Sequence, residues 1–313
     1  MAAVSLSRGA VWSDAGSHMG DRALGATKVA ITVDDLPEHA DLVPGISRED
    51  VSRSIINALK ENRVPQAYGF ANGTFMKLHP EEIAILKQWL AAGYPLGNHT
   101  YHHSDLDKMS VRAYISDIEK EDRLLESLVP FSPLIQKRHM FRYPFLNEGD
   151  SLAKRNALRT YLTRNGYRIA EVTTDYYDWA WTDAFTRCSD KGDTKSIAWL
   201  KSHVVDSANI HLRDSNQIAR RLFGRDIPQI LLIHVGVFDA LTLGEILKNW
   251  RAQGVQFISL DDALVDSVYA FNPDTTYENG RNFLEQTALA RKISLDAFED
   301  STYSIERLDQ ICK

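Results

Sequence analysis

Short apolar runs alternate with amphipathic segments along most of the chain, and this alternation limits the possible folds more than any other feature. Strand-like runs occur at Lys28–Val33 and Gln229–His234, and helical apolar spacing is clear over Arg48–Glu61 and Val111–Leu128. The pattern of strand followed by helix repeats about seven times. Because parallel strands need a crossover helix, the pattern predicts an α/β fold with a parallel sheet, either open or closed into a barrel.

The second half of the chain gives less regular signals. Tyr167–Val172 reads as one strand, and Thr194–Leu222 is predicted to be helical in two pieces. A helix at Leu243–Gln253 should precede a last strand at Val255–Leu260. The polar tail after Tyr269 is expected to pack outside the barrel as a short helical extension.

Charge and hydropathy exclude several classes of protein. The chain has 36 Lys and Arg against 42 Asp and Glu, a net charge of −6. This balance argues against a nucleic-acid-binding surface, which needs clustered basic residues. No apolar stretch reaches the roughly 18 residues that a membrane span requires. The sequence gives no signal for an oligomeric state.

The termini and the two cysteines allow narrower expectations. Gly16-Ser17-His18-Met19 resembles the scar of a cleavable tag, so residues 1–27 are expected to be a tag or leader remnant that is disordered or peripheral. Cys188 and Cys312 exclude a cysteine-based zinc cluster and fit either one disulfide or two free thiols. We hypothesise that they join, tying the long segment 183–228 to the tail.

Ionisable side chains stand just after successive predicted strands. In chain order they are Asp34, Asp35, His99, Arg142, Asp178 and His234. Active sites of α/β barrels lie at the carboxyl ends of the strands, so this arrangement predicts one converging site. Each residue taken alone has a plainer explanation: a turn for the Asp pair, a structural salt bridge for the Arg, aromatic core packing around the second Asp, or a core hydrogen bond for the last His.

The HTYHH segment offers a metal site. His99 and His103 are four residues apart, so their imidazoles can share one cation, although surface histidines also show this spacing. His102 complicates the choice of ligand. Two His and one Asp form a triad that leaves positions open for water and substrate.

Five motifs in this order resemble the polysaccharide deacetylase family, also called NodB homology or carbohydrate esterase family 4. The resemblance runs from about Lys28 to Asp266. The motifs are TVDDLP from Thr32, HTYHH from His99, RYPF from Arg142, DYYDW from Asp175 and LLIH from Leu231. Leu36 stands where the family usually has Gly, and Val33 where it has Phe.

The resemblance implies a fold and a role for each residue. The fold would be a distorted (β/α) barrel of about seven parallel strands, with a catalytic domain at 28–270 and a C-terminal extension at 271–313. Asp34 would be the general base and His234 the general acid, positioned by Arg142 and Asp178 respectively. The remaining roles are metal ligation by Asp35, His99 and His103, and substrate contact by Phe145, Trp179 and Leu232.

The resemblance also implies an activity. The chain would be a metal-dependent hydrolase that removes acetyl groups from GlcNAc-type residues of a polymer, either peptidoglycan or chitin-type oligosaccharide, and releases acetate. Zinc would be the usual metal, with cobalt or manganese able to serve. A wall polymer as partner implies a periplasmic or secreted enzyme. The alternatives are an O-acetyl esterase, a non-sugar amide hydrolase, or a catalytically weak sugar-binding protein.

Overall fold

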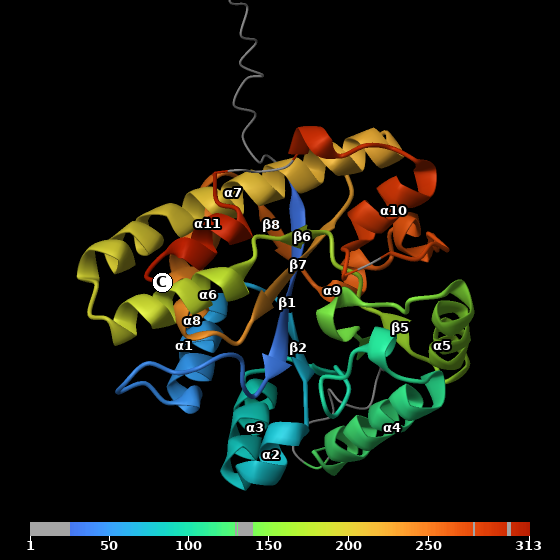
Figure 1. Cartoon of the computed structure of the whole chain (residues 1–313), viewed down its shortest axis with the longest axis horizontal. Helices are drawn as coiled ribbons and strands as arrows, with labels where there is room; N and C mark the ends of the chain where they lie inside the picture. The colour runs from blue at the N-terminus through green and yellow to red at the C-terminus, as the bar shows by residue number, and fades with distance from the viewer. Residues whose placement is uncertain (1–25, 129, 131–139, 278, 299–301) are drawn as a thin grey trace, which may run out of the picture.

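One parallel sheet forms the centre of the molecule (Figure 1). The structure is a computed structural model that describes residues 26–128, 130, 140–277, 279–298 and 302–313. Nearly all of the predicted leader at 1–27 therefore lies outside the described residues. The strands are β1 (Lys28–Leu36), β2 (Ala67–Ala71), β3 (Leu96–Asn98), β4 (Met140–Phe141), β5 (Arg168–Ile169), β6 (Thr174–Asp175), β7 (Gln229–His234) and β8 (Gln256–Ile258).

The sheet is curled into a half-barrel. Its strand order is β5-β4-β3-β2-β1-β7-β6, and β8 pairs with the first residues of β1. The chain between β5 and β6 crosses the open side, because Ala170 N–H donates to the Phe141 carbonyl at one edge and Thr173 N–H donates to the Ile230 carbonyl at the other. This architecture confirms the predicted distorted barrel of about seven parallel strands.

Helices surround the strands (Figure 1). They are α1 (Arg48–Glu61), α2 (Thr74–Leu78), α3 (Ile83–Ala91), α4 (Val111–Ser127), α5 (Leu152–Arg164), α6 (Asp178–Asp190), α7 (Thr194–Phe223), α8 (Val237–Ala252), α9 (Leu260–Ala263), α10 (Phe283–Arg291) and α11 (Ile305–Gln310). The first of these shows why the sequence folds this way. Ser47 caps α1 in a reciprocal box with Asp50, and Ile55 and Leu59 are fully buried on its inner face.

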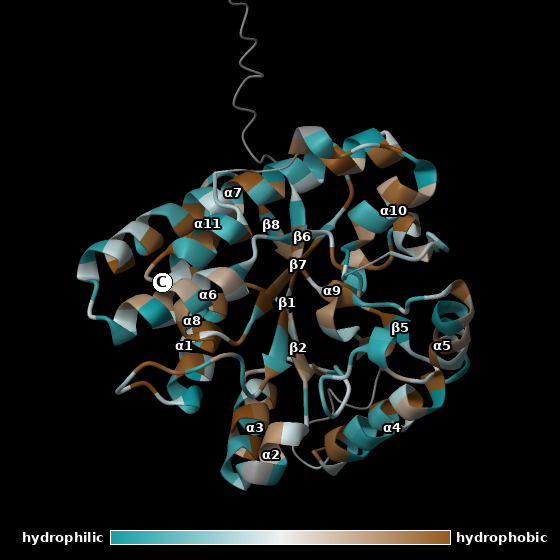
Figure 2. Cartoon of the chain, viewed as in Figure 1, coloured by the Kyte–Doolittle hydropathy of each residue, from teal (hydrophilic) through white to brown (hydrophobic). Residues whose placement is uncertain are grey.

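The core lies between the sheet and these helices. Residues 29–36 of β1 are buried on both faces, as expected for the central strand of a parallel sheet. Three large side chains, Trp89, Trp181 and Trp250, are fully buried. Figure 2 shows the same division, with apolar colour on the inner strands and hydrophilic colour over much of the outer helices.

Three predicted elements differ from the structure. The segment predicted as two helical pieces is the single helix α7, because Asp193 caps its start, Gly224 at φ +73° ends it, and neither Gly nor Pro interrupts it. Helix α8 begins at Val237, six residues before the predicted start; its first turn is buried, so it lacks an amphipathic pattern. The predicted strand at 167–172 pairs only at β5 and then crosses toward β6.

The C-terminal segment is tied to the helical layer. Helix α10 packs on α7, and α11 packs on α6. Arg187 on α6 donates to the carbonyls of Leu308 and Ile311. Cys188 and Cys312 form a disulfide with Cα atoms 5.2 Å apart, which confirms the hypothesis that the long segment is linked to the tail.

The described part of the chain contains no candidate membrane-spanning helix. None of the helices there is both long enough and apolar enough to span a bilayer.

The disulfide should stabilise the fold. It closes a loop of 124 residues, so replacing both cysteines by Ala should lower the free energy of unfolding by about 2–4 kcal/mol through the greater entropy of the unfolded chain. Urea unfolding of the double variant measures the loss. The wild type unfolded in a reducing agent is the control and should match the variant. Equal stability of the oxidised wild type and the variant would contradict the expectation.

Candidate active site

The register between β1 and β7 brings the first two predicted residues together. Asp34 pairs with His234, and Thr32 pairs with Leu232, in parallel register. Residues two apart on a strand face the same side, so all four side chains lie on one face of the curled sheet, near the carboxyl ends of β1 and β7. The general base and general acid implied by the sequence motifs are therefore neighbours.

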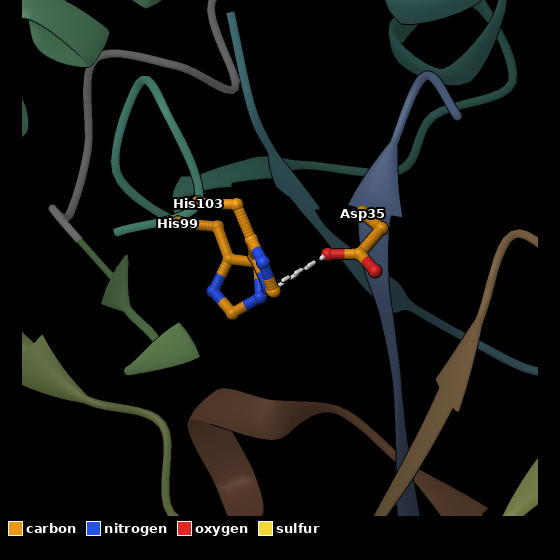
Figure 3. A group of neighbouring side chains, drawn as sticks. All are labelled: Asp35, His99 and His103. Carbon is orange, nitrogen blue, oxygen red and sulfur yellow. Dashed lines mark ion pairs between the residues drawn. The ribbon is translucent and has the colours of Figure 1, made fainter. Parts of the chain in front are cut away.

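A β-bulge turns Asp35 toward a different partner. The register between β1 and β2 shifts between Val33 and Leu36, and Asp35 has a left-handed backbone with φ +67°. Bulges of this kind redirect a side chain beside active sites. Asp35 Oδ1 lies 3.4 Å from His99 Nε2 and 3.3 Å from His103 Nε2 (Figure 3). Figure 3 shows both rings turned toward the carboxylate at the end of β1.

The atoms of this trio are set for a cation. His99 Nδ1 lies 2.9 Å from the Arg142 carbonyl oxygen. Because a carbonyl only accepts, Nδ1 carries the hydrogen and donates it, and the lone pair on Nε2 faces Asp35. Among the described residues, buried Asp35 Oδ1 has no hydrogen-bond partner. Tetrahedral ligands 2.0–2.1 Å from zinc lie about 3.3–3.4 Å apart, which matches the observed separations. Asp35, His99 and His103 therefore fit a metal ion.

The electrostatic surroundings of Asp35 and His103 favour the protonation states that bind metals. Burial alone would raise the pKa of Asp35, but the neighbouring imidazoles of His103, His39 and His99 outweigh it and hold the pKa well below its usual range. Burial lowers the pKa of His103 to about 4, and Asp35 offsets this only in part. A charged carboxylate and a neutral imidazole are the states that bind metals.

Asp34 is held by a buried guanidinium. Arg142 Nη1 donates to both oxygens of Asp34 at 3.1 and 3.3 Å, and its other nitrogens donate to Thr32 Oγ1 and the Ala170 carbonyl. Burial lowers the pKa of Arg142, partly offset by the charge of Asp34. Both side chains are almost wholly buried, so the carboxylate has a fixed orientation next to the His99 ring, whose Nε2 is 3.6 Å from it.

His234 is paired with Asp178 at the start of α6. The imidazole Nδ1 donates to Asp178 at 3.0 Å, and the backbone N–H of His234 donates to the same carboxylate at 2.6 Å. Burial would lower the pKa of His234, but the Asp178 carboxylate outweighs burial and raises the pKa well above its usual range. The same pairing lowers the pKa of Asp178 against the effect of its own burial.

Two further carboxyl groups stand close to Asp178. Burial, with the charge of Asp178, raises the pKa of Asp175 to about 7. Burial and the same charge raise the pKa of Asp239 well above its usual range, and Tyr176 donates to this group at 2.9 Å. These shifts leave Asp178 as the charged partner of His234.

Unusual backbone conformations gather at the site. Six non-glycine residues in the left-handed region of φ belong to the segments that build it: Asp35, Thr100, His103, Phe145, Leu146 and Tyr177. Such residues cost about 1–3 kcal/mol each and persist where the surrounding structure fixes them. Such residues cluster at active sites and ligand clamps, so the backbone conformations and the ionisable side chains indicate the same candidate site.

Comparison with known proteins identifies the family. The polysaccharide deacetylase family model matches residues 21–197, more than half of the chain. The chain belongs to the polysaccharide deacetylase family. The match includes Asp35, His99, His103, Arg142 and Asp178, and it ends before His234.

Individual relatives agree with this assignment. The chain is 27% identical over 159 residues to the peptidoglycan-N-acetylglucosamine deacetylase of Bacillus cereus, covering 51% of this chain and 49% of that protein. It thus spans about half the length of that relative. It resembles in fold a carbohydrate esterase family 4 pseudoenzyme from Bacillus anthracis, BA3943, with a TM-score of 0.50, 16% identity and coverage of 76% and 66%. A BA3943 mutant with restored enzymatic activity gives a TM-score of 0.53, 17% identity and coverage of 76% and 68%.

The structure explains how this family member tolerates Leu36 in place of the usual Gly. Leu36 is fully buried, and it occupies space beside Gly69 on β2. A Cβ on Gly69 would lie 2.2 Å from Leu36 Cδ1 and 2.8 Å from Trp89 Nε1. The missing side chain on β2 makes room for the added one on β1.

The remaining predicted residues occupy different surroundings. Phe145 is 55% exposed, and its ring contacts His103 edge-on with centroids 4.4 Å apart. Leu232 is buried beside Thr32, whereas Trp179 is half-buried against the main apolar cluster. The substrate contacts of these three residues stay predictions. His102, which complicated the choice of ligand, pairs with Asp117 through Nδ1 instead.

Sequence reasoning missed two residues of the candidate site. Thr32 accepts a hydrogen bond from Arg142 and donates one to the Leu231 carbonyl. His39 Nδ1 lies 2.8 Å from Asp35 Oδ2. The sequence holds one signal for His39: it is four residues after Asp35, the same spacing that separates His99 from His103.

Removing Arg142 should be costly. Arg142→Met leaves the Asp34 charge buried without its partner, and the free energy of unfolding should fall by about 3–5 kcal/mol. Adding Asp34→Asn should restore much of it, because both buried charges are then gone. Urea unfolding measures both variants.

The matched control is Arg53→Met, which removes an exposed partner of Asp50. It should cost about 0–1 kcal/mol. If Arg142→Met also lowered the free energy of unfolding by only about 0–1 kcal/mol, the structural role assigned to the buried pair would be contradicted.

Proposed function

We propose that this polysaccharide deacetylase family protein is a metal-dependent N-deacetylase that acts on GlcNAc-type residues of a polymer. Peptidoglycan is the first candidate, on the name of the Bacillus cereus relative, and chitin-type oligosaccharide is the second. The observation that carries the proposal is Asp35 Oδ1, which has no hydrogen-bond partner among the described residues and faces His99 and His103, beside Asp34 and His234.

The proposed metal is zinc, held by Asp35, His99 and His103. Bound zinc would polarise the acetamide carbonyl and lower the pKa of water. Cobalt or manganese could be accepted by the same donors, because nitrogen and carboxylate ligands discriminate weakly among first-row ions.

Two proton transfers are assigned to side chains of the protein. Asp34, oriented by Arg142, would take a proton from the attacking water as the new C–O bond forms. His234 carries a proton on Nδ1 toward Asp178, and its raised pKa favours a second proton on Nε2. That proton would pass to the leaving nitrogen as the C–N bond breaks, giving acetate and a free amine.

The remaining proposed contacts concern the acyl group. The backbone N–H of Phe145 would help to hold the oxyanion, and the left-handed backbone at this residue would fix its direction. Trp179 and Leu232 would line the acetyl pocket. Leu232 lies two residues before His234 on the same face of β7, which supports its assignment.

We further propose that the protein is exported to the periplasm or secreted. The Cys188–Cys312 disulfide supports this location, because disulfides form and persist in oxidising compartments and are rare in the cytosol. A wall polymer as substrate would require the same location.

Metal binding provides the first test. The wild type should bind about one zinc ion tightly, and His99→Ala or His103→Ala should lose tight binding, because each removes one of three ligands. Equilibrium dialysis with metal analysis measures both. His102→Ala is the matched control: that side chain is 52% exposed and paired with Asp117, so binding should not change. A full zinc equivalent in both ligand variants would refute the assignment.

Activity provides the second test. Acetate release from GlcNAc oligomers and from purified peptidoglycan should depend on added zinc. Asp34→Asn should retain zinc but lose about 10²–10⁴-fold in kcat, the usual contribution of a general base. Unchanged activity would remove Asp34 from the mechanism. Bound zinc with no acetate from either polymer would favour another acyl substrate, such as an O-acetyl ester or a non-sugar amide, or a binding role.

A further inference from the structure

His39 contacts both halves of the site from the loop that follows β1. Its Nδ1 is 2.8 Å from Asp35 Oδ2. Its ring stacks on His234, with centroids 4.3 Å apart and an angle of 28° between the planes. The side chain is largely buried, at 17% exposure. One residue therefore contacts a proposed metal ligand and the proposed general acid.

We propose that His39 is a positioning residue, which fixes the Asp35 carboxylate for cation binding through a hydrogen bond and supports the His234 ring by stacking. This inference rests on the proposed metal site. It assigns a role to a residue outside the five motifs that carry the family resemblance.

The hydrogen bond fixes the orientation of the carboxylate relative to the histidines. Because a carboxylate only accepts, His39 Nδ1 is the donor to Oδ2, and Oδ1 is left toward His99 and His103. The terminal torsion of an Asp side chain is broad, so without a donor the carboxylate plane could rotate away from the orientation that faces the histidines. Donors to ligating carboxylates typically contribute 10–100-fold to metal affinity.

The distances distinguish His39 from a metal ligand. Asp35, His39 and His234 also lie close enough together to form a group of possible ligands. However, the 2.8 Å between His39 and Asp35 is a hydrogen-bond length, shorter than the 3.3–3.4 Å to His99 and His103. The geometry therefore assigns His39 a supporting role.

The loop around His39 is anchored on both sides of that residue. The backbone N–H of Glu38 donates to the Asp35 carbonyl at 2.7 Å. The Glu38 carboxylate pairs with Arg48 at the start of α1, and Arg48 also donates to the Ala40 carbonyl at 3.1 Å. These contacts hold the chain immediately before and after His39, so its ring position is fixed by the fold.

Two substitutions separate the two contacts. His39→Phe keeps a flat ring but removes the donor. His39→Asn keeps a donor, since its amide nitrogen is the same number of bonds from Cα as Nδ1, but removes the ring. Zinc affinity is measured by competition with a chromophoric chelator. We expect His39→Phe to bind zinc about 10–100-fold more weakly than the wild type, and His39→Asn to stay near the wild type.

Two more readouts test positioning against a merely structural role. The visible absorption of the cobalt-loaded protein should change in His39→Phe and be retained in His39→Asn. At saturating zinc, His39→Asn should lower kcat about 2–10-fold with KM unchanged, the size of one lost ring contact. His102→Phe is the matched control, because His102 also pairs with a carboxylate but faces Asp117, and its zinc affinity should not change.

The outcomes separate this inference from the proposed function. If the wild type binds zinc and folded His39→Phe binds it equally well, the positioning role is overturned and the metal site stands. If the wild type binds no zinc, the metal site fails and the positioning role fails with it. If His39→Phe does not fold, His39→Leu also lacks the donor and should show the same loss of affinity; wild-type affinity in that variant would overturn the role.

Discussion

The buried pair of Arg142 and Asp34 is the interaction on which the rest of the site depends. Arg142 follows β4, which is three strands from β1, a distance of about 14 Å in a flat sheet. Only a curled sheet brings the two side chains within hydrogen-bond distance. The guanidinium also bonds Thr32 on β1 and the Ala170 carbonyl after β5, and it lies over the Phe70 ring. One cation thus joins strands from both sides of the half-barrel and fixes the carboxylate.

Three ionisable residues of the site, Asp34, His99 and His234, each have a second group that fixes their orientation. Arg142 holds Asp34, and the Arg142 carbonyl holds the tautomer of His99. Asp178 holds His234 through both its ring and its backbone N–H. Left-handed backbone conformations aim the connecting loops at the same point. Such preorganisation is what acid–base and electrostatic catalysis require, because the groups then need no rearrangement during reaction.

The C-terminal segment contributes to the site although it lies beyond the family match. A Cβ on Gly280 would lie 1.6 Å from the carbonyl oxygen of Phe145, so the segment packs directly on the backbone of that loop. Phe283 N–H donates to the Val172 carbonyl at 2.7 Å, next to the crossing that spans the open side of the sheet. The extension therefore packs on the backbone of Phe145, the residue whose N–H is assigned to the oxyanion in the proposed function.

The sequence by itself determined the order of strands and helices, the family and most of the ionisable residues, because periodicity and short motifs are local properties. The sequence-based prediction was wrong for α7, because nothing in the middle of the sequence marks it as one continuous helix. It was also wrong for the start of α8, because the buried first turn has no amphipathic pattern. It also missed His39 and the accommodation of Leu36 by Gly69, since both depend on contacts outside the motifs. Tertiary structure alone decided which side chains meet, because the curl of the sheet and the β1–β7 register set those distances.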